Sequence, residues 1–172
     1  MKQLLLDSCI YGEMVLDPEL GVIQKAYHNT DIGFVYGFSL IRKELRNTPK
    51  NKRQSNKNLR IFLLSLYDEF VGERNLSVEE SDLLTIAQKY YEQYRQLGGN
   101  FSLHELLQDY LIVACATKKK MDLVVSNDHV SMLSDISLKA YTLVNQNLSL
   151  KNPHFIDYKT FKALLFGRRG GD

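Results

Sequence analysis

Two short apolar runs in this 172-residue chain each lead to an aspartate, and this pairing limits the folds that the chain can adopt. Leu4-Leu5-Leu6 ends at Asp7, and Leu123-Val124-Val125 is followed three residues later by Asp128. Apolar runs of this length are typical of buried strands rather than of helices. In parallel sheets, ligands bind outside the carboxyl ends of the strands, so we expect both aspartates to face one crevice.

The rest of the chain alternates short apolar runs with segments of helical periodicity. We expect strands at 2–6, 33–37, 123–126 and 154–156, and helices near 20–27, 39–46, 59–71, 80–97, 102–118 and 159–166. This alternation favours an α/β fold with three layers, α/β/α, around a short and mostly parallel central sheet. The length predicts a single domain over residues 1–166, followed by an unstructured tail at 167–172.

Helix signals add detail to this prediction. Ser39 is the expected N-cap of the helix that runs to about Arg46. Ser102 and Glu105 have the spacing of a capping box at the start of the most apolar helix. The expected core residues of the helix at 59–71 are Ile61, Leu64, Leu66 and Phe70.

The charge of the chain is unevenly distributed. From Arg42 to Arg60 there are eight basic residues and one acid, so this block carries +7 and the remainder of the +2 chain carries −5. The stretch 47–58 has no apolar residue except Pro49 and is expected to be a loop or a frayed helix start, the segment most prone to disorder. A basic block can hold a polyanion, and the alternative is a solvated, mobile loop.

Composition excludes several classes of protein. No tract of about 18 apolar residues is present, so no membrane span is expected. The two cysteines, Cys9 and Cys115, form no CxxC pair, which argues against a disulfide framework and favours a reducing, cytoplasmic compartment. The four histidines lack metal-site spacing, and no glycine-rich phosphate loop occurs.

Two further acids stand near apolar residues. Asp109 interrupts the apolar run from Leu106 to Val113, and Glu44 shares a helical face with Leu40 and Ile41. Buried carboxylates are costly unless they are neutralised, hydrogen-bonded or bound to a cation. The alternatives are an exposed ion pair for Glu44, an acid at the edge of the buried stripe for Asp109, and turn or cap roles for the two strand-ending aspartates.

Taken together, these motifs resemble PIN-domain nucleases, including the VapC-type toxins. The matching segments are Leu4–Ser8, Ile41–Leu45, Asp109–Ala116 and Leu123–Asp128, in the order and approximate spacing of that family. The resemblance covers nearly all of the chain from Lys2 to about Leu133. It implies a PIN-like fold over the single domain and a ribonuclease that leaves a 5′-phosphate.

The resemblance also assigns roles to residues. It implies that Asp7, Glu44, Asp109 and Asp128 are catalytic and together bind Mg²⁺ or Mn²⁺, with Ser8, Ser126 and Asn127 in support. The basic residues that follow Glu44 would then contact the RNA backbone, and these are Lys43, Arg46, Lys50, Lys52 and Arg53. Tyr36 and Phe38 are candidates to stack a base, although core packing is the more common use of aromatic residues.

This chain departs from the family in two places. Cys9 stands where many members have Asn, so one supporting contact is expected to be absent. His129-Val130-Ser131 stands where many members have a further acid, which weakens a second metal position. Toxin-type members form homodimers and bind an antitoxin-type protein, so both are implied partners beside RNA. The alternative function is a non-catalytic RNA-binding or scaffold protein that retains the PIN fold.

Overall fold

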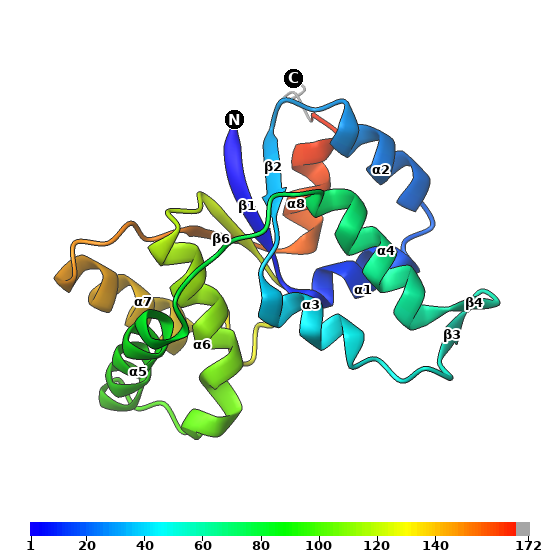
Figure 1. The fold of residues 1–172 in the computed structure, drawn as a ribbon. Helices are drawn as coiled ribbons and strands as arrows, with labels where there is room; N and C mark the ends of the chain where they lie inside the picture. Colours follow the sequence, from blue (N-terminus) through cyan, green and yellow to red (C-terminus); the bar gives the residue numbers. More distant parts are fainter. Residues whose placement is uncertain (168–172) are drawn as a thin grey trace.

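A parallel four-stranded sheet forms the centre of the molecule (Figure 1). The computed structural model describes residues 1–167. The strand order is β2-β1-β5-β6, and the strands are β1 (Lys2–Leu6), β2 (Gly33–Tyr36), β5 (Leu123–Val125) and β6 (His154–Ile156). In the register, Leu6 pairs with Val125 and Val125 pairs with Ile156. The carboxyl ends of the three strands β1, β5 and β6 therefore lie level with one another.

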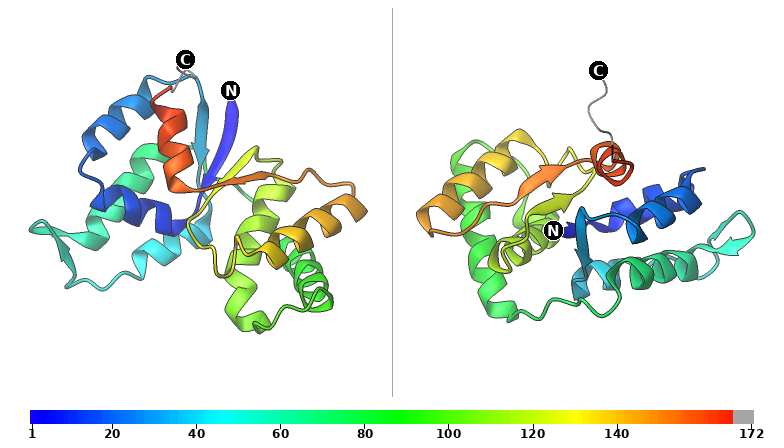
Figure 2. Two further views of the ribbon diagram at one scale, coloured as in Figure 1. Left: turned by 180° about the vertical axis from the view of Figure 1, so that it is seen from behind. Right: turned by 90° about the horizontal axis from the view of Figure 1, so that it is seen from above.

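Helices cover both faces of the sheet, as the two views in Figure 2 show. The eight helices of the described chain are α1 (Ser8–Leu16), α2 (Leu20–His28), α3 (Ser39–Arg46), α4 (Leu59–Val71), α5 (Glu80–Gln96), α6 (Leu103–Lys118), α7 (Asp135–Asn147) and α8 (Tyr158–Leu165). Helices α5, α6 and α7 pack together on one side of the sheet, and α1, α2, α4 and α8 lie on the other. Helix α3 contacts α1, α4 and α6, so it joins the two groups.

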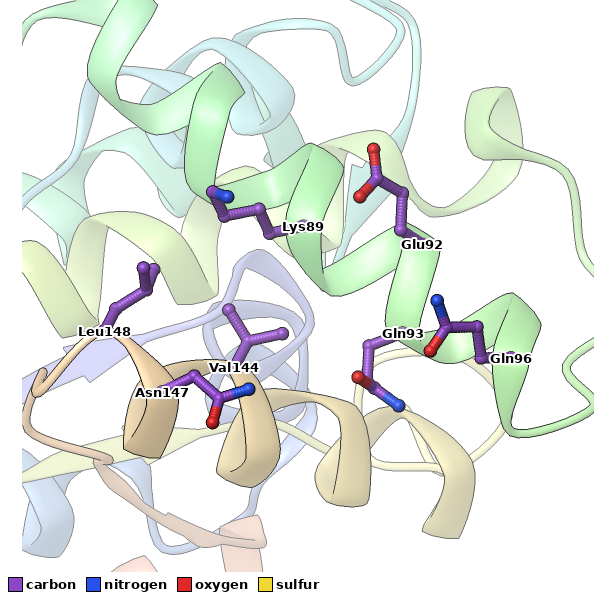
Figure 3. Close-up of a pocket in the computed structure, with 7 residues that line it drawn as sticks. All are labelled: Lys89, Glu92, Gln93, Gln96, Val144, Asn147 and Leu148. Carbon is purple, nitrogen blue, oxygen red and sulfur yellow. The ribbon is translucent and has the colours of Figure 1, made fainter.

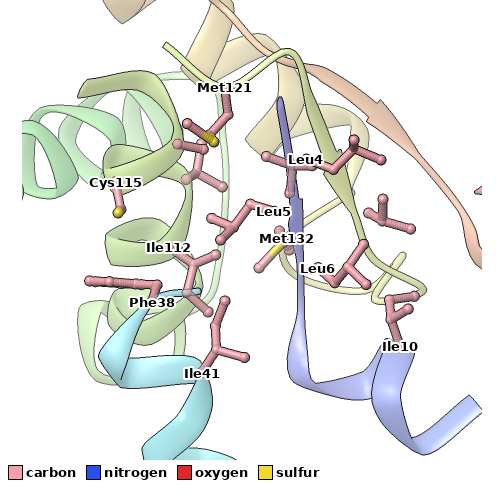
Figure 4. Close-up of a cluster of buried hydrophobic side chains, with 14 of the residues drawn as sticks. Leu4, Leu5, Leu6, Ile10, Phe38, Ile41, Ile112, Cys115, Met121 and Met132 are labelled. Carbon is pink, nitrogen blue, oxygen red and sulfur yellow. The ribbon is translucent and has the colours of Figure 1, made fainter. Parts of the chain in front are cut away.

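The two inner strands are apolar where both faces of the sheet are covered. Leu4, Leu5 and Leu6 of β1 are all at most 1% exposed, and the whole of β5 is buried. Figure 4 shows Leu5 of β1 in the same buried cluster as Ile112 of α6 and Ile41 of α3. This cluster extends from β1 to α8, and it fixes the positions of the elements that carry the polar residues described below.

Gly33, the first residue of β2, lies in close contact with the neighbouring strand β1. A Cβ atom added to Gly33 would lie 2.0 Å from the backbone oxygen of Lys2, its partner on β1. No side chain fits at that distance, so glycine is required where β2 begins beside β1.

The three-layer α/β/α prediction is confirmed, and so are the four strands and the capping box of α6. Helices α1 and α7 were not predicted. Helix α3 has Phe38 at its N-cap, so Ser39 is the first helical residue instead of the cap. The prediction that Ile61 lies in the core is wrong, because its side chain is 63% exposed on the outer face of α4.

The basic stretch at 47–58 is more ordered than expected. It contains a two-stranded antiparallel hairpin, β3 (Arg53–Gln54) and β4 (Lys57–Asn58), here called the basic arm together with residues 47–52. Ser55 and Asn56 form its turn with φ of 49° and 63°, the left-handed conformation of tight hairpins. Asn58 ends the arm and caps α4 by accepting a hydrogen bond from the backbone N–H of Ile61.

The predicted unstructured tail begins at Gly167, and its residues 168–172 lie outside the described residues. None of the helices between residues 1 and 167 combines the length and the apolarity that crossing a membrane requires.

Candidate active site

Asp7 occupies the junction between β1 and α1. Its side chain is 6% exposed, and its Oδ1 accepts a hydrogen bond from the backbone N–H of Ser8 at 2.8 Å, so it caps the helix that follows. Its Oδ2 accepts a hydrogen bond from Ser126 Oγ at 2.8 Å and one from the Cys9 thiol at 3.4 Å. The carboxylate is therefore held on both oxygens at the carboxyl end of the central strand.

Asp128 lies in the loop that follows β5. Its Oδ1 accepts hydrogen bonds from the backbone N–H groups of Val130, at 3.1 Å, and Ser131, at 2.9 Å. Its own N–H donates to Ser126 Oγ at 3.1 Å. Ser126 is fully buried, and its hydroxyl group links this aspartate to Asp7.

Asp109 extends from α6 toward the same loop. Ser131 Oγ lies 2.6 Å from Asp109 Oδ2 and 2.5 Å from Asp128 Oδ2, so the two carboxylates flank one hydroxyl group. A serine hydroxyl has one proton to donate. The hydroxyl can therefore donate to only one of the two carboxylates at a time.

Glu44 lies at the rim, on α3, and is exposed to solvent. Its Oε2 accepts a hydrogen bond from Gln108 Nε2 of α6 at 3.1 Å. The surface ion pair that was the alternative for Glu44 does not occur within residues 1–167, because Arg42 pairs with Asp68 and no cation contacts Glu44.

The electrostatics of these acids show that they share one environment. Burial, together with repulsion by Asp7, Asp128 and Glu44, raises the pKa of Asp109 to about 7, against the lowering effect of the hydrogen bond from Ser131. Burial also raises the pKa of Asp7, with a contribution from Asp128. Partial burial of the Glu44 carboxylate against the protein raises its pKa, and repulsion by Asp7 acts in the same direction. The fold therefore brings all four acids together at one place.

No positive charge of the described chain compensates these acids. The salt bridges within residues 1–167 involve none of the four carboxylates. In the same residues, no three histidine, cysteine, aspartate or glutamate side chains form a ready-made metal cage. The donor set nevertheless fits Mg²⁺ or Mn²⁺, because such hard cations take oxygen ligands and keep several waters, so few direct carboxylate contacts are needed.

The supporting residues have different roles. Ser8 contributes its backbone N–H to Asp7. The Asn127 side chain is turned toward α8, where its Oδ1 accepts a hydrogen bond from the Tyr158 N–H at 2.9 Å, so it anchors the loop instead of contacting an acid. Cys9 does make the contact that was expected to be absent, since its sulfur contacts Asp7 and accepts from the Asn127 N–H at 3.4 Å.

Sequence reasoning missed three residues at this site. Cys9, Gln108 and Ser131 each contact one or two of the four acids. Gln108 directly precedes Asp109 in the sequence, so its position next to an expected site acid could have identified it as a candidate. Ser131 was identified only as a departure from the family pattern, and only the structure assigns its contacts.

The five basic candidates lie on the surface of α3 and of the basic arm that follows it. Lys43 and Arg46 are exposed on α3, and Lys50, Lys52 and Arg53 are exposed in the basic arm, which extends beyond α3 and α4 (Figure 1). Within the described chain none of these five side chains is in a salt bridge. The two aromatic candidates differ, because Phe38 is 5% exposed and belongs to the core, whereas Tyr36 is half-buried.

A groove lies between α5 and α7 (Figure 3). Its lining residues are Lys89, Glu92, Gln93, Gln96, Val144, Asn147 and Leu148. Neither of these helices carries any of the four acids, so the groove is not part of the candidate active site.

The sequence matches no protein-family model and no curated protein. The fold matches solved structures. A chain from the structure of FitAB bound to an IR36 DNA fragment is 17% identical, with a TM-score of 0.56 over 90% of this chain and 94% of that chain. A chain of VapBC-1 from nontypeable Haemophilus influenzae is 12% identical, with a TM-score of 0.54 over 91% of this chain and 98% of that chain. At these identities the likeness concerns the fold, and it confirms the PIN-like fold that the sequence resemblance implied.

Proposed function

We propose that this chain, which has a PIN-like fold, is a metal-dependent endoribonuclease that hydrolyses phosphodiester bonds of RNA at the acid cluster. One observation carries the proposal. Four carboxylates from distant segments lie near enough to repel one another, three of them have raised pKa values, and no cation of the described chain neutralises them. Such an arrangement is costly for the fold alone, and a bound divalent cation would compensate it.

Asp7, Glu44, Asp109 and Asp128 are the residues that would hold Mg²⁺ or Mn²⁺. When bound, such an ion lowers the pKa of a coordinated water and stabilises the negative charge that develops on a phosphodiester. The carboxylates need fixed positions for this task. Hydrogen bonds to backbone N–H groups and to the buried Ser126 hydroxyl hold Asp7 and Asp128 in place.

The chain also supplies a surface for the rest of the substrate. RNA carries one negative charge per nucleotide, and the four acids alone would repel it. Exposed lysines and arginines without acidic partners attract the backbone and set its position without reading sequence. In this proposal the contacts come from Lys43, Arg46, Lys50, Lys52 and Arg53.

The family resemblance further suggests partners. We infer that the chain forms a homodimer and binds an antitoxin-type protein that blocks the acid cluster. Tyr91 of α5 is only partly buried, whereas the two other tyrosines of this helix, Tyr90 and Tyr94, are not available for such an interface. Both are at most 3% exposed and pack against Tyr110.

The rival function is a non-catalytic RNA-binding or scaffold protein. The observation in its favour is the lack of a ready-made cage of three metal ligands among residues 1–167. Binding of Mn²⁺ separates the two functions, because an ion that binds the folded state raises the free energy of unfolding by about 2.7 kcal/mol at a concentration of 100 times its Kd. For a chain of this size that amounts to an increase in melting temperature of roughly 5–10 °C.

Cleavage of end-labelled RNA by the purified protein tests the proposal directly. We expect cleavage with Mg²⁺ or Mn²⁺, none with EDTA, and none by Asp109→Asn with either ion. Asp82→Asn is the matched control, because Asp82 is an exposed aspartate near the start of α5 whose side chain pairs with Lys118. No cleavage by the native chain, together with no effect of Mn²⁺ on its melting temperature, would favour the scaffold function instead. Cleavage by Asp109→Asn would remove Asp109 from the mechanism.

A further inference from the structure

Ser131 holds a position that neither the fold nor the proposed reaction accounts for by itself. Its hydroxyl oxygen lies 2.6 Å from Asp109 Oδ2 and 2.5 Å from Asp128 Oδ2. Asp109 belongs to helix α6, whereas Asp128 belongs to the loop after β5. The hydroxyl is therefore a direct side-chain link between two elements whose carboxylates repel each other.

Asp109 depends on this link more than the other acids depend on theirs. Within residues 1–167, the Ser131 hydroxyl is the one hydrogen-bond partner of the Asp109 side chain. Asp128 keeps two backbone N–H donors on its other oxygen, and Asp7 keeps a backbone donor and two side-chain donors. Without Ser131, the described structure offers nothing to fix the orientation of the Asp109 carboxylate.

The position of Ser131 is itself fixed by its surroundings. Its N–H donates to Asp128 Oδ1 at 2.9 Å, and its carbonyl oxygen accepts a hydrogen bond from Ser134 Oγ at 3.1 Å. The next residue, Met132, is fully buried and its carbonyl oxygen accepts a hydrogen bond from Tyr141 Oη at 2.9 Å. The hydroxyl is therefore presented to the two acids by a turn that is anchored in the core.

We propose that Ser131 is a positioning residue that fixes Asp109 against Asp128 and thereby sets the affinity of the site for a divalent cation. Its effect on the cation rests on the proposed function, whereas its effect on the Asp109 side chain does not. A polar group that orients metal-binding side chains typically contributes about ten- to a hundredfold to metal affinity or activity. The reason is that carboxylates held in one orientation lose little conformational freedom when the ion binds.

The first test compares Mn²⁺ binding by calorimetry in four proteins. We expect Ser131→Ala to bind Mn²⁺ about ten- to a hundredfold more weakly than the native chain. Ser131→Thr keeps the hydroxyl and should restore most of the affinity. Ser134→Ala is the matched control. Ser134 caps α7 by accepting from the Ser137 N–H at 3.2 Å, contacts none of the four acids, and reaches only the carbonyl oxygen of Ser131. Its removal leaves the Ser131 hydroxyl, the Ser131 N–H bond to Asp128 and the contact between Met132 and Tyr141 in place.

The Ser134→Ala control separates the positioning of the Asp109 carboxylate from the general stability of the loop. Ser134→Ala should lower the melting temperature through removal of the cap and leave the Mn²⁺ affinity unchanged. An equal loss of affinity in Ser134→Ala and Ser131→Ala would overturn the proposal, because general loosening of the loop would then explain both. Native affinity in a folded Ser131→Ala protein would overturn it as well.

A second measurement needs no metal and keeps this inference distinct from the proposed function. NMR coupling constants report whether the Asp109 side chain occupies one rotamer. We expect a single rotamer in the metal-free native chain, in Ser131→Thr and in Ser134→Ala, and averaging in Ser131→Ala. A single rotamer in Ser131→Ala would refute the positioning role. Averaging in that variant, combined with no Mn²⁺ binding by the native chain, would support the positioning role and count against the nuclease function.

Discussion

The acid cluster and the basic arm concentrate opposite charges by opposite means. The four carboxylates come from segments as far apart as residues 7 and 128, and they meet because β1 pairs with β5 and because α3 and α6 pack together. The basic arm takes its charges from one continuous stretch, residues 47–58, folded by a two-residue turn. One region is a product of the tertiary fold, and the other is a product of local sequence.

This difference affects the energetics of each region. The carboxylates are crowded, two of them are mostly surrounded by protein, and the raised pKa values record the free energy that this placement costs. The arm's cations are solvated, so their placement costs the fold little. We therefore expect changes in the acids to alter both chemistry and stability, and changes in the charges of the arm to alter binding alone.

The largest expected effect comes from removing one charge of the cluster. Asp128→Asn keeps the shape of the side chain, and its amide oxygen can still accept from the Val130 and Ser131 N–H groups. We expect RNA cleavage to fall by roughly a thousandfold or more, since an ion-holding carboxylate contributes several kcal/mol to the transition state. Single-turnover cleavage measures the effect, and circular dichroism checks the fold. Near-native cleavage in this variant would remove Asp128 from the mechanism.

The next effect is a dependence of stability on pH in the metal-free protein. Asp109 has a pKa of about 7 when folded, against the usual 3.8 when unfolded. Between pH 4 and 7 the folded state therefore keeps a proton that the unfolded state has released, and stability falls as pH rises through this window. The decrease is up to about 4 kcal/mol for this group, and Asp7 and Glu44 act in the same direction.

Urea unfolding in EDTA, at several pH values across that window, measures this decrease. Asp109→Asn should flatten the curve, because its amide cannot titrate, and Mn²⁺ should restore stability of the native chain at the upper end. Stability that rises with pH over the same range would show that the acids are not crowded in solution.

A smaller effect is expected from the arm. Replacing Lys50, Lys52 and Arg53 by glutamine should weaken RNA binding and reduce its salt dependence by about one unit of slope for each phosphate that the arm no longer neutralises. The affinity for Mn²⁺ should stay native, because none of these side chains contacts the acids. A variant with Lys25, Lys89 and Lys139 replaced has the same change in net charge on α2, α5 and α7 and serves as the control. Equal salt slopes in the two variants would reduce the arm to a solvated loop.

The smallest effect is expected at the turn of the arm. Asn56 has φ of 63°, where asparagine is tolerated and most other residues are strained. Asn56→Ala should loosen the hairpin by about 1 kcal/mol and weaken RNA binding slightly. Hydrogen exchange would detect faster exchange of amides in 52–58, with no change at Asp7 or Asp128. Faster exchange at the acid cluster would mean that the two regions are coupled after all.

The strands that lead to Asp7 and Asp128 are easier to predict from the sequence than the helices that follow them. The strands before Asp7 and Asp128 stand out because parallel strands covered on both faces are continuously apolar. Helix α1 was missed because its apolar residues are spread around the helix and Gly12 lies near its middle, so it lacks the one-sided pattern of an amphipathic helix. Helix α7 was missed although Ser134 caps it and Ala140, Tyr141 and Val144 form its buried face.

The supporting contacts could not be read from the sequence for a different reason. Cys9 contacts Asp7 within the turn after β1, and Ser131 contacts Asp128 within the turn after β5, so both depend on turn conformations that the sequence does not specify. The bond from Ser131 to Asp109 exists only because the turn after β5 lies beside α6, which is a property of the folded chain. The error at Ile61 has a related origin. On α4, Leu63, Leu66 and Phe70 face the core, and their spacing leaves Ile61 on the opposite side.

The cap that Asp7 provides to α1 makes one side chain responsible for two separable properties. Starting the helix requires an acceptor oxygen, whereas attracting an ion requires a full negative charge. Asparagine satisfies the first requirement and alanine satisfies neither. A chain with Asn at this position could therefore lose its chemistry while keeping its architecture, which makes Asp7→Asn the natural starting point for an inert form that still recognises the same partners.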